Sequence, residues 1–261
     1  MKALSIAATG MMAQQTNVDV ISNNIANANT TGFKASRAAF QELIYQSIQR
    51  EGAVTSEAGS TRPVGIDIGM GVQTAGTVRL NTQGGMVATE NQLNVAIDGR
   101  GYFSVTLPDG GTAYTRDGSF QLSPEGEIVT MQGYRVEPGM VVPENTTAVE
   151  INEQGVVMAY VENDPVPVEL GQFSLTTFVN EPGMRPVGNN FLLATEASGE
   201  AQVVNPGDPG AGMIRQGYLE ASNVNVIQQI TDLISAQRAY EMNSKSIETA
   251  DQMLSAANQI R

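Results

Sequence analysis

The residues of this chain that could do chemistry are mainly carboxylates, because the sequence contains no histidine and no cysteine. Their absence excludes thiolate catalysis, disulfides, the usual zinc sites and every acid–base scheme that depends on histidine. The remaining candidates cluster in sequence and could be imagined as a glycosidase pair or as Ca²⁺ ligands: Asp98, Asp109, Asp117, Glu125 and Glu127. The first four adjoin a glycine, as turn residues do, and none fits the EF-hand spacing. The sequence therefore predicts no catalytic residue and no metal ligand.

Aromatic residues in the same region offer a second possibility, a platform for stacking a sugar ring. They are Tyr102, Phe103, Tyr114, Phe120 and Tyr134. Aromatic side chains in strands more often fill a core, and no nucleophile elbow or dinucleotide fingerprint accompanies them. We expect a protein that is not an enzyme and has no cofactor, with a secreted carbohydrate-binding β protein as the alternative from another functional class.

Charge separates the ends of the chain from its middle. The 261 residues carry a net charge of −13, yet residues 1–50 hold four basic and two acidic residues, and residues 226–261 hold three and four. Residues 51–225 therefore carry −14, which disfavours nucleic acid and anionic lipid as partners. Neither a membrane-spanning run nor a cleaved signal is expected, because long uninterrupted apolar segments are missing. The nearly neutral ends can approach each other or further copies.

The end of the chain shows a long helical pattern, from about residue 226 to 260. Apolar residues recur every seven positions at Val226, Leu233, Tyr240, Ile247 and Leu254. The second position of the repeat carries smaller or polar residues: Gln229, Ala236, Asn243, Ala250 and Ala257. This is the a/d pattern of a coiled coil over about four heptads. So narrow an apolar stripe requires another helix.

The beginning of the chain repeats this pattern, which predicts a helix over about residues 3–26. Leu4, Met11, Val18 and Ile25 are seven residues apart, and Ala7, Ile21 and Ala28 take the second position. The two ends can therefore pair, either on one globular core or as a seam between long helices within or between chains. The thin stripes favour the seam.

An asparagine-rich stretch, residues 23–34, ends the first helix. Asn and Thr side chains compete for backbone hydrogen bonds, and Gly32 permits a positive φ angle. Four asparagines within seven residues also suit specific polar contacts in a crowded joint, although an ordinary helix cap explains them as well.

The spacing of apolar residues changes in the middle of the chain. Residues 35–49 are predicted to be partly helical through Phe40, Leu43, Ile44 and Ile48, and residues 50–71 to form an extended excursion or long hairpin. From about residue 72 to 216, alternating apolar residues and glycine turns predict an antiparallel β domain. The fold class is therefore α+β, with paired terminal helices, an extended arm and a β-rich central domain.

Several blocks of the sequence resemble the family of bacterial flagellar rod and hook proteins. Residues 26–34, ANANTTGFK, match the family signature AN-x-x-T-x-GFK. Further similar blocks run from end to end: residues 8–11 (ATGM), 19–25 (DVISNNI), 95–103 (VAIDGRGYF), 113–120 (AYTRDGSF), 217–226 (GYLEASNVNV) and 237–245 (QRAYEMNSK). In its length and in residues 45–71, the chain resembles the distal rod subunits of this family most. A proximal rod or hook subunit is the alternative.

The resemblance implies a structural subunit of a helical polymer. Residues 1–34 and 217–261 would form an inner helical domain around a hollow tube, residues 35–75 an arm that contacts neighbours, and residues 76–216 an outer β domain. Implied partners are further copies, proximal rod and hook proteins, the P- and L-ring proteins and the flagellar type III export apparatus, in the periplasmic rod of the basal body. The expected subunit-packing residues are Leu4, Met11, Val18, Ile25, Asn27, Gly32, Phe33, Val226, Leu233, Tyr240, Ile247 and Leu254.

Overall fold

The computed structural model describes residues 2–49, 51, 63–162 and 166–259, with the main chain alone for residues 257–259. The chain divides into two compact units. Unit 1 comprises Met1–Ala26, Ser36–Val78 and Asn225–Arg261, and unit 2 comprises Asn27–Ala35 and Arg79–Val224.

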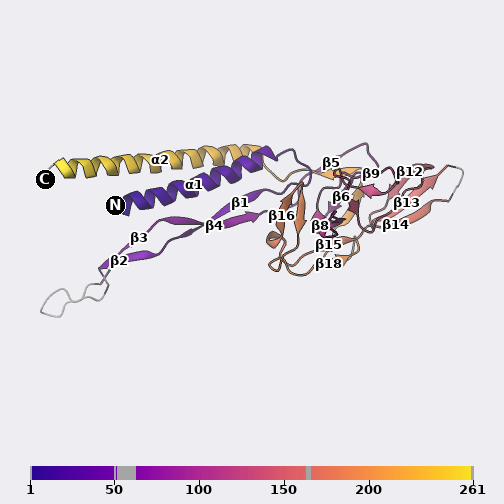
Figure 1. Ribbon diagram of the computed structural model, residues 1–261, viewed down its shortest axis with the longest axis horizontal. Coiled ribbons are helices and arrows are strands. Elements are labelled where there is room, and N and C mark those ends of the chain that lie inside the picture. Colours follow the sequence, from indigo (N-terminus) through magenta and orange to yellow (C-terminus); the bar gives the residue numbers. More distant parts are fainter. Residues whose placement is uncertain (1, 50, 52–62, 163–165, 260–261) are drawn as a thin grey trace. The chain divides into compact units, whose positions relative to one another are not determined.

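Unit 1 contains the two helices and two β ribbons (Figure 1). Its elements are α1 (Lys2–Ala26), β1 (Ser36–Glu42), β2 (Tyr45–Gln49), β3 (Ile66–Gly69), β4 (Val72–Arg79, whose last residue belongs to unit 2) and α2 (Val226–Gln259). The helices pack side by side and run in opposite directions, and α1 also packs against β1. Both helices predicted from the seven-residue repeats are thereby confirmed. Neither has an apolar stretch long enough to cross a membrane, within the residues that are described.

The helical prediction for residues 35–49 is wrong, because this segment forms strands β1 and β2. Phe40, Ile44 and Ile48 are spaced by four, as on a helix face, but the backbone is extended. Strand β1 pairs with β4, and β2 pairs antiparallel with β3, with Gln46 opposite Ile68 and Ser47 opposite Asp67. Partners some twenty to forty residues away in sequence thus override a local helical pattern, as tertiary context often does. The extended excursion predicted next includes residues 50 and 52–62, which lie outside the described residues.

Unit 2 is an antiparallel β body. Its strands are β5 (Met86–Ala88), β6 (Val95–Asp98), β7 (Tyr102–Thr106), β8 (Thr112–Thr115), β9 (Gln121–Leu122), β10 (Ile128–Val129), β11 (Arg135–Val136), β12 (Thr146–Ile151), β13 (Val156–Val161), β14 (Val168–Gln172), β15 (Leu175–Thr177), β16 (Arg185–Gly188), β17 (Phe191–Leu193), β18 (Gln202–Val204), β19 (Met213–Gln216) and β20 (Tyr218–Glu220). One turn of 3₁₀-helix, η1, spans Glu181–Gly183. The α+β class is confirmed.

The largest sheet of unit 2 has nine strands, in the order β16-β17-β8-β7-β11-β10-β9, with β15 joining β7 to β18. Three smaller pairings complete the body: β12-β13-β14, β19-β6 and β20-β5. Strand β7 pairs with β8, β11 and β15, so it lies at the centre of the hydrogen-bonded network.

The core of unit 2 lies on both sides of strand β7. On one side Phe103 packs edge to face against Phe120, with ring centroids 5.1 Å apart, and Phe103 also contacts Phe173. On the other side Tyr102 belongs to a second, smaller buried cluster. Even Ser104 is buried, and its hydroxyl lies 2.8 Å from that of Thr176. The alternation of apolar residues predicted for this region therefore does not separate core from solvent in β7, because both faces of the strand are covered.

A tight turn follows α1, at the position where the sequence predicted the helix to stop. Gly32 has φ +67°, and its N–H donates to the carbonyl of Glu220 at 2.7 Å. A Cβ atom on Gly32 would lie 2.9 Å from the backbone of Arg116 and Asp117. Only glycine satisfies both the left-handed conformation and this close approach.

We predict that Gly32→Ala destabilises the β body by about 3 kcal/mol, because it adds a steric clash to a strained φ angle. The matched control is Gly110→Ala, where φ is +80° and a Cβ would meet no atom within 4 Å. This control should cost about 1 kcal/mol through the backbone alone. Urea unfolding of the full chain, followed by circular dichroism, measures both. Equal losses would show that the close approach to residues 116 and 117 has no energetic weight.

Candidate subunit-packing site

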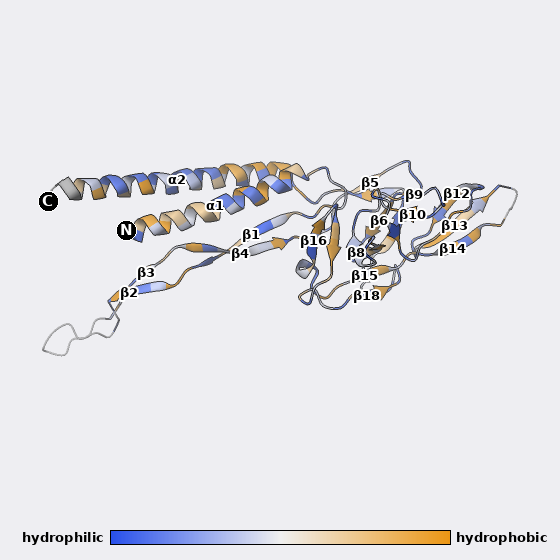
Figure 2. Cartoon of the chain, viewed as in Figure 1, coloured by the Kyte–Doolittle hydropathy of each residue, from blue (hydrophilic) through white to orange (hydrophobic). Residues whose placement is uncertain are grey.

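The helix pair buries the second position of the heptad repeat more deeply than the first. Ala236 is 3% exposed and Ala250 7%, and on α1 Ala7 and Ile21 are buried. The residues predicted from the first position are less covered. Leu4, Met11, Val18, Ile25, Leu233 and Ile247 are half-buried, whereas Val226, Tyr240 and Leu254 are exposed by 40%, 43% and 40%. Polar and apolar residues alternate along both helices (Figure 2). Within one chain, the packing of α1 on α2 covers the first-position residues only in part.

Small and polar residues set the close spacing of the helices. A Cβ on Gly10 would lie 2.9 Å from the amide nitrogen of Asn243, so α1 approaches α2 closely there. Nearer to the other end of α1, the buried Asn24 amide donates to Gln229 of α2 at 2.9 Å and to the Ser36 carbonyl at 2.7 Å. Its oxygen accepts from the Ser36 N–H at 2.9 Å. Asn24 therefore fastens α1 to both α2 and β1.

Asn24 was not among the predicted packing residues, although the asparagine-rich stretch pointed to polar contacts in a joint. The residues that were predicted there have partners within unit 2. Asn27 accepts from the Thr30 hydroxyl at 3.1 Å, Gly32 is buried, and the half-buried Phe33 uses its carbonyl to accept from the Asn223 N–H at 3.4 Å. Their backbone contacts form the turn itself. Their part in packing between subunits stays a prediction.

A buried group of charges lies beside this turn, and sequence reasoning did not single it out. Lys34 Nζ is 2.6 Å from Glu220 Oε1 and donates to the Thr82 carbonyl at 2.8 Å. Arg116 Nε is 3.4 Å from Glu220 Oε2, and the Gly84 N–H donates to Oε1 at 2.9 Å. Burial lowers the pKa of Lys34, while the hydrogen bond and charge of Glu220 act in the opposite direction. Two opposite charges and the Gly84 N–H thus offset the burial of Glu220, although its Oε2 accepts no hydrogen bond from the described residues.

The carboxylates first considered for chemistry each have a local partner. Asp98 pairs with Arg215 at 2.8 Å, Asp109 accepts from the Gly111 N–H, and Asp117 accepts from Ser119. Glu125 accepts from Ser123, and Glu127 lies 3.4 Å from Arg135. They form no group of three or more that could hold a metal in the described part of the chain.

The aromatic residues considered for sugar stacking are placed differently from such a platform. Tyr102, Phe103, Tyr114 and Phe120 are buried, and Tyr134 packs against Phe191 at 5.6 Å. Buried rings cannot stack on a sugar, so this observation removes the support for a carbohydrate-binding function.

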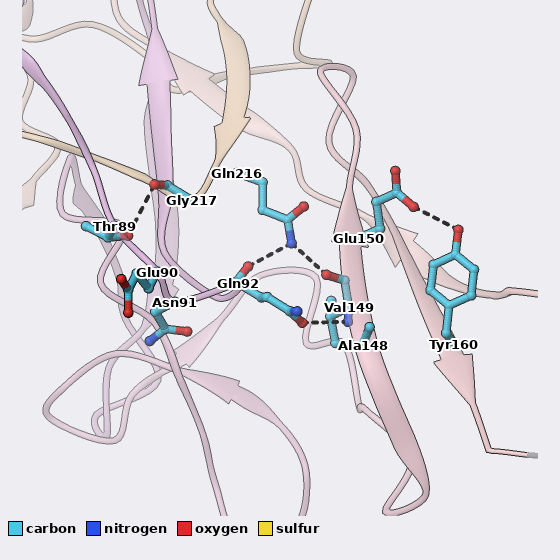
Figure 3. A pocket seen from close by; sticks show the side chains of 10 residues that line it. All are labelled: Thr89, Glu90, Asn91, Gln92, Ala148, Val149, Glu150, Tyr160, Gln216 and Gly217. Atoms are coloured by element: carbon cyan, nitrogen blue, oxygen red, sulfur yellow. Dashed lines mark hydrogen bonds between the residues drawn. The ribbon is translucent and has the colours of Figure 1, made fainter.

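An open hollow of about 390 Å³ lies beside strand β12 (Figure 3). Two glutamine side chains cross its floor. Gln216 Nε2 donates to the carbonyls of Gln92 and Val149, and its oxygen accepts from the Ile151 N–H. Gln92 Oε1 accepts from the Val149 N–H at 3.1 Å. These amides replace a neighbouring strand along β12, so the polar groups of the hollow serve the fold.

Comparison with known proteins identifies the family. Residues 4–34 match the profile described as flagella basal body rod protein, residues 96–159 match the flagellar hook protein FlgE/F/G D1 domain, and residues 215–260 match the flagellar basal body rod FlgEFG protein C-terminal profile. The chain is 50% identical to the flagellar basal-body rod protein FlgG of Caulobacter vibrioides over 100% of both chains. It is 47% identical to FlgG of Agrobacterium fabrum over 98% of this chain and 97% of the relative. It is 46% identical to FlgG of Buchnera aphidicola over 99% of both.

The matched profiles include residues 26–34, which form the turn after α1, and Glu220, which lies at the centre of the buried charges. Both the order of the blocks and their full-length coverage agree with the relatives. The chain therefore belongs to the FlgG family of flagellar basal-body rod proteins.

Proposed function

We propose that this chain is the self-assembling subunit of the distal rod, a hollow helical tube that transmits motor torque to the hook and has no catalytic activity. The observation that carries this proposal is the incomplete burial of the heptad stripes. Val226, Tyr240 and Leu254 remain about two-fifths exposed although α1 already packs on α2. Apolar residues that one chain leaves uncovered on a long helix are suited to contacts with further copies.

The packing of unit 1 supports assembly rather than independent stability. The buried apolar side chains in its described part are Ile21 and five alanines, whereas unit 2 buries five phenylalanines. Because buried apolar area supplies most folding free energy, unit 1 has much less intrinsic stabilisation per residue. Neighbouring copies would supply the missing area, and the ends would become ordered during assembly.

The proposed partners follow from the family and from the chemistry of the chain. Residues 1–34 and 217–261 would line the tube, residues 35–75 would contact neighbouring subunits, and residues 76–216 would face outwards. Proximal rod and hook proteins would adjoin the ends of the tube, and the P- and L-ring proteins would surround it. A chain without cysteine passes unfolded through the flagellar type III export apparatus without disulfide formation. The periplasmic rod of the basal body is the proposed location.

We predict that Tyr240→Asp prevents assembly while leaving the free energy of unfolding of the monomer within about 1 kcal/mol, because this half-exposed side chain becomes buried only between copies. The matched control is Ser246→Asp, an exposed position on another side of α2. Polymer formation by the purified full chain is followed by sedimentation and electron microscopy. Normal filaments from Tyr240→Asp would contradict the role of the first-position stripe.

A second prediction concerns the free monomer. Amide hydrogens of residues 2–30 and 226–259 should exchange rapidly in the monomer and become protected on assembly, because their apolar partners come from other copies. Amides of strand β7, which is buried on both faces, provide the internal reference and should exchange slowly in both states. Mass spectrometry of peptides after deuterium labelling measures both. Strong protection of the two helices in the monomer would favour a conventional globular subunit instead.

A further inference from the structure

Strand β12 is the longest strand at the edge of a sheet among the strands that the structure describes in unit 2. It has six residues and pairs with β13 on one side only. The other edge strands are shorter: β14 has five residues, β16 has four, β18 has three and β9 has two. A long edge strand presents backbone groups to which another chain can add a strand.

The backbone groups of β12 alternate between β13 and the open edge. Glu150 lies opposite Met158 of β13, whereas its neighbours Val149 and Ile151 direct their N–H groups towards the edge. Beyond them, the Glu153 carbonyl accepts from the Ile214 N–H at 3.0 Å. The Val149 N–H, the Val149 carbonyl and the Ile151 N–H are therefore the groups with which an added strand would pair.

Two glutamine side chains occupy all three of these groups (Figure 3). Gln92 Oε1 accepts from the Val149 N–H at 3.1 Å. Gln216 Nε2 donates to the Val149 carbonyl at 2.6 Å, and its Oε1 accepts from the Ile151 N–H at 3.0 Å. A side-chain amide has the same kinds of donor and acceptor as a peptide group. It satisfies the edge of β12 as a strand would, but it presents no new strand edge to a further chain.

The same edge has two other features that disfavour strand addition. The register of β12 on β13 shifts between Thr146 and Ala148, and such bulges are common at protected sheet edges. Glu90 and Glu150 are the charged residues among the described residues that line the adjoining hollow. Two copies of this edge would therefore bring carboxylates together. These features act in the same direction as the glutamine contacts.

We propose that Gln92 and Gln216 guard the edge of β12 against pairing with β12 of a second copy. Two identical strands can pair antiparallel about a two-fold axis, because each offers the same outward groups. A sheet that continued from one β body into another would compete with any ordered contact between copies. This inference concerns the folded β body and does not require the proposed function.

The full-length double variant Gln92→Ala/Gln216→Ala tests the guard. Sedimentation velocity is measured at a concentration at which the unsubstituted chain is monomeric, in about 0.5 M salt to screen the acidic residues of the hollow. The fraction of the double variant in dimers and larger species should rise at least about fivefold, because three edge groups become free to pair. A double variant that is folded by circular dichroism and remains monomeric would overturn the proposal.

The matched control is Gln172→Ala, which removes a bond of 2.8 Å from a glutamine amide to the Gln154 carbonyl in the same three-stranded sheet. It leaves the three edge groups of β12 occupied, so its association should equal that of the unsubstituted chain. If Gln172→Ala associates as strongly as the double variant, the loss of any glutamine contact suffices and the guard is refuted.

Hydrogen exchange shows where the copies join. Amides of residues 146–151 should exchange at least about tenfold faster in the monomeric double variant than in the unsubstituted chain, and should be protected again in its associated form. Association that protects other residues but not these would overturn the proposal. If the double variant does not fold, Gln92→Ala decides alone, since this exposed side chain supplies one of the three bonds. Its association should then rise at least about twofold, and an unchanged monomer would refute the guard.

Discussion

The buried carboxylate of Glu220 is the constraint on which the turn between helix and β body depends. Its side chain is inaccessible to solvent, and a lone buried charge would cost several kcal/mol. Lys34, Arg116 and the Gly84 N–H compensate that cost, while the Glu220 carbonyl accepts from Gly32. Three blocks that are far apart in sequence, residues 26–34, 113–120 and 217–226, therefore meet at one group. The segments that lead out of α1 and into α2 are held together in unit 2 by charge and by a glycine that admits no side chain.

The two units are stabilised by different kinds of packing. Unit 2 is self-sufficient, since Phe103, Phe120 and Phe173 form a closed aromatic core and β7 is covered on both faces. Unit 1 relies on alanines, on the close approach at Gly10 and on the Asn24 amide. Small residues permit a tight helix pair but bury little apolar area. An assembly subunit benefits from this division, because the β body remains folded while the helices still have contacts to make.

The sequence predicted the elements whose pattern is local, and it failed where partners are remote. The heptad repeats located both helices to within a residue or two, and Gly32 marked the turn correctly. Residues 35–49 were misassigned because apolar residues four positions apart can occur on a helix and also on an exposed β ribbon. The partner strand of this ribbon, Ile66–Gly69, lies further along the chain. Asn24 and Glu220 could not be found by spacing, since partners 205 and 186 residues away in sequence help to satisfy these buried polar groups. The blocks that resemble the family include Asn24 and Glu220, but the resemblance does not show which groups these residues contact.

The surfaces that remain after the helices have paired determine what kind of assembly is possible. The α1–α2 seam uses the small second-position residues within one chain, so these are no longer available for a symmetric contact between copies. The apolar side chains that stay exposed on α2 include Val226, Tyr240 and Leu254 at the first position of the repeat, and Ile227, Ile230 and Ile234 elsewhere on the helix. Contacts between two different surfaces generate either closed rings or open helical filaments, depending on whether the rotation between copies closes. Residues 51–225 carry −14 and therefore repel the same residues of neighbouring copies, so attraction between copies is expected to come mainly from the nearly neutral terminal segments.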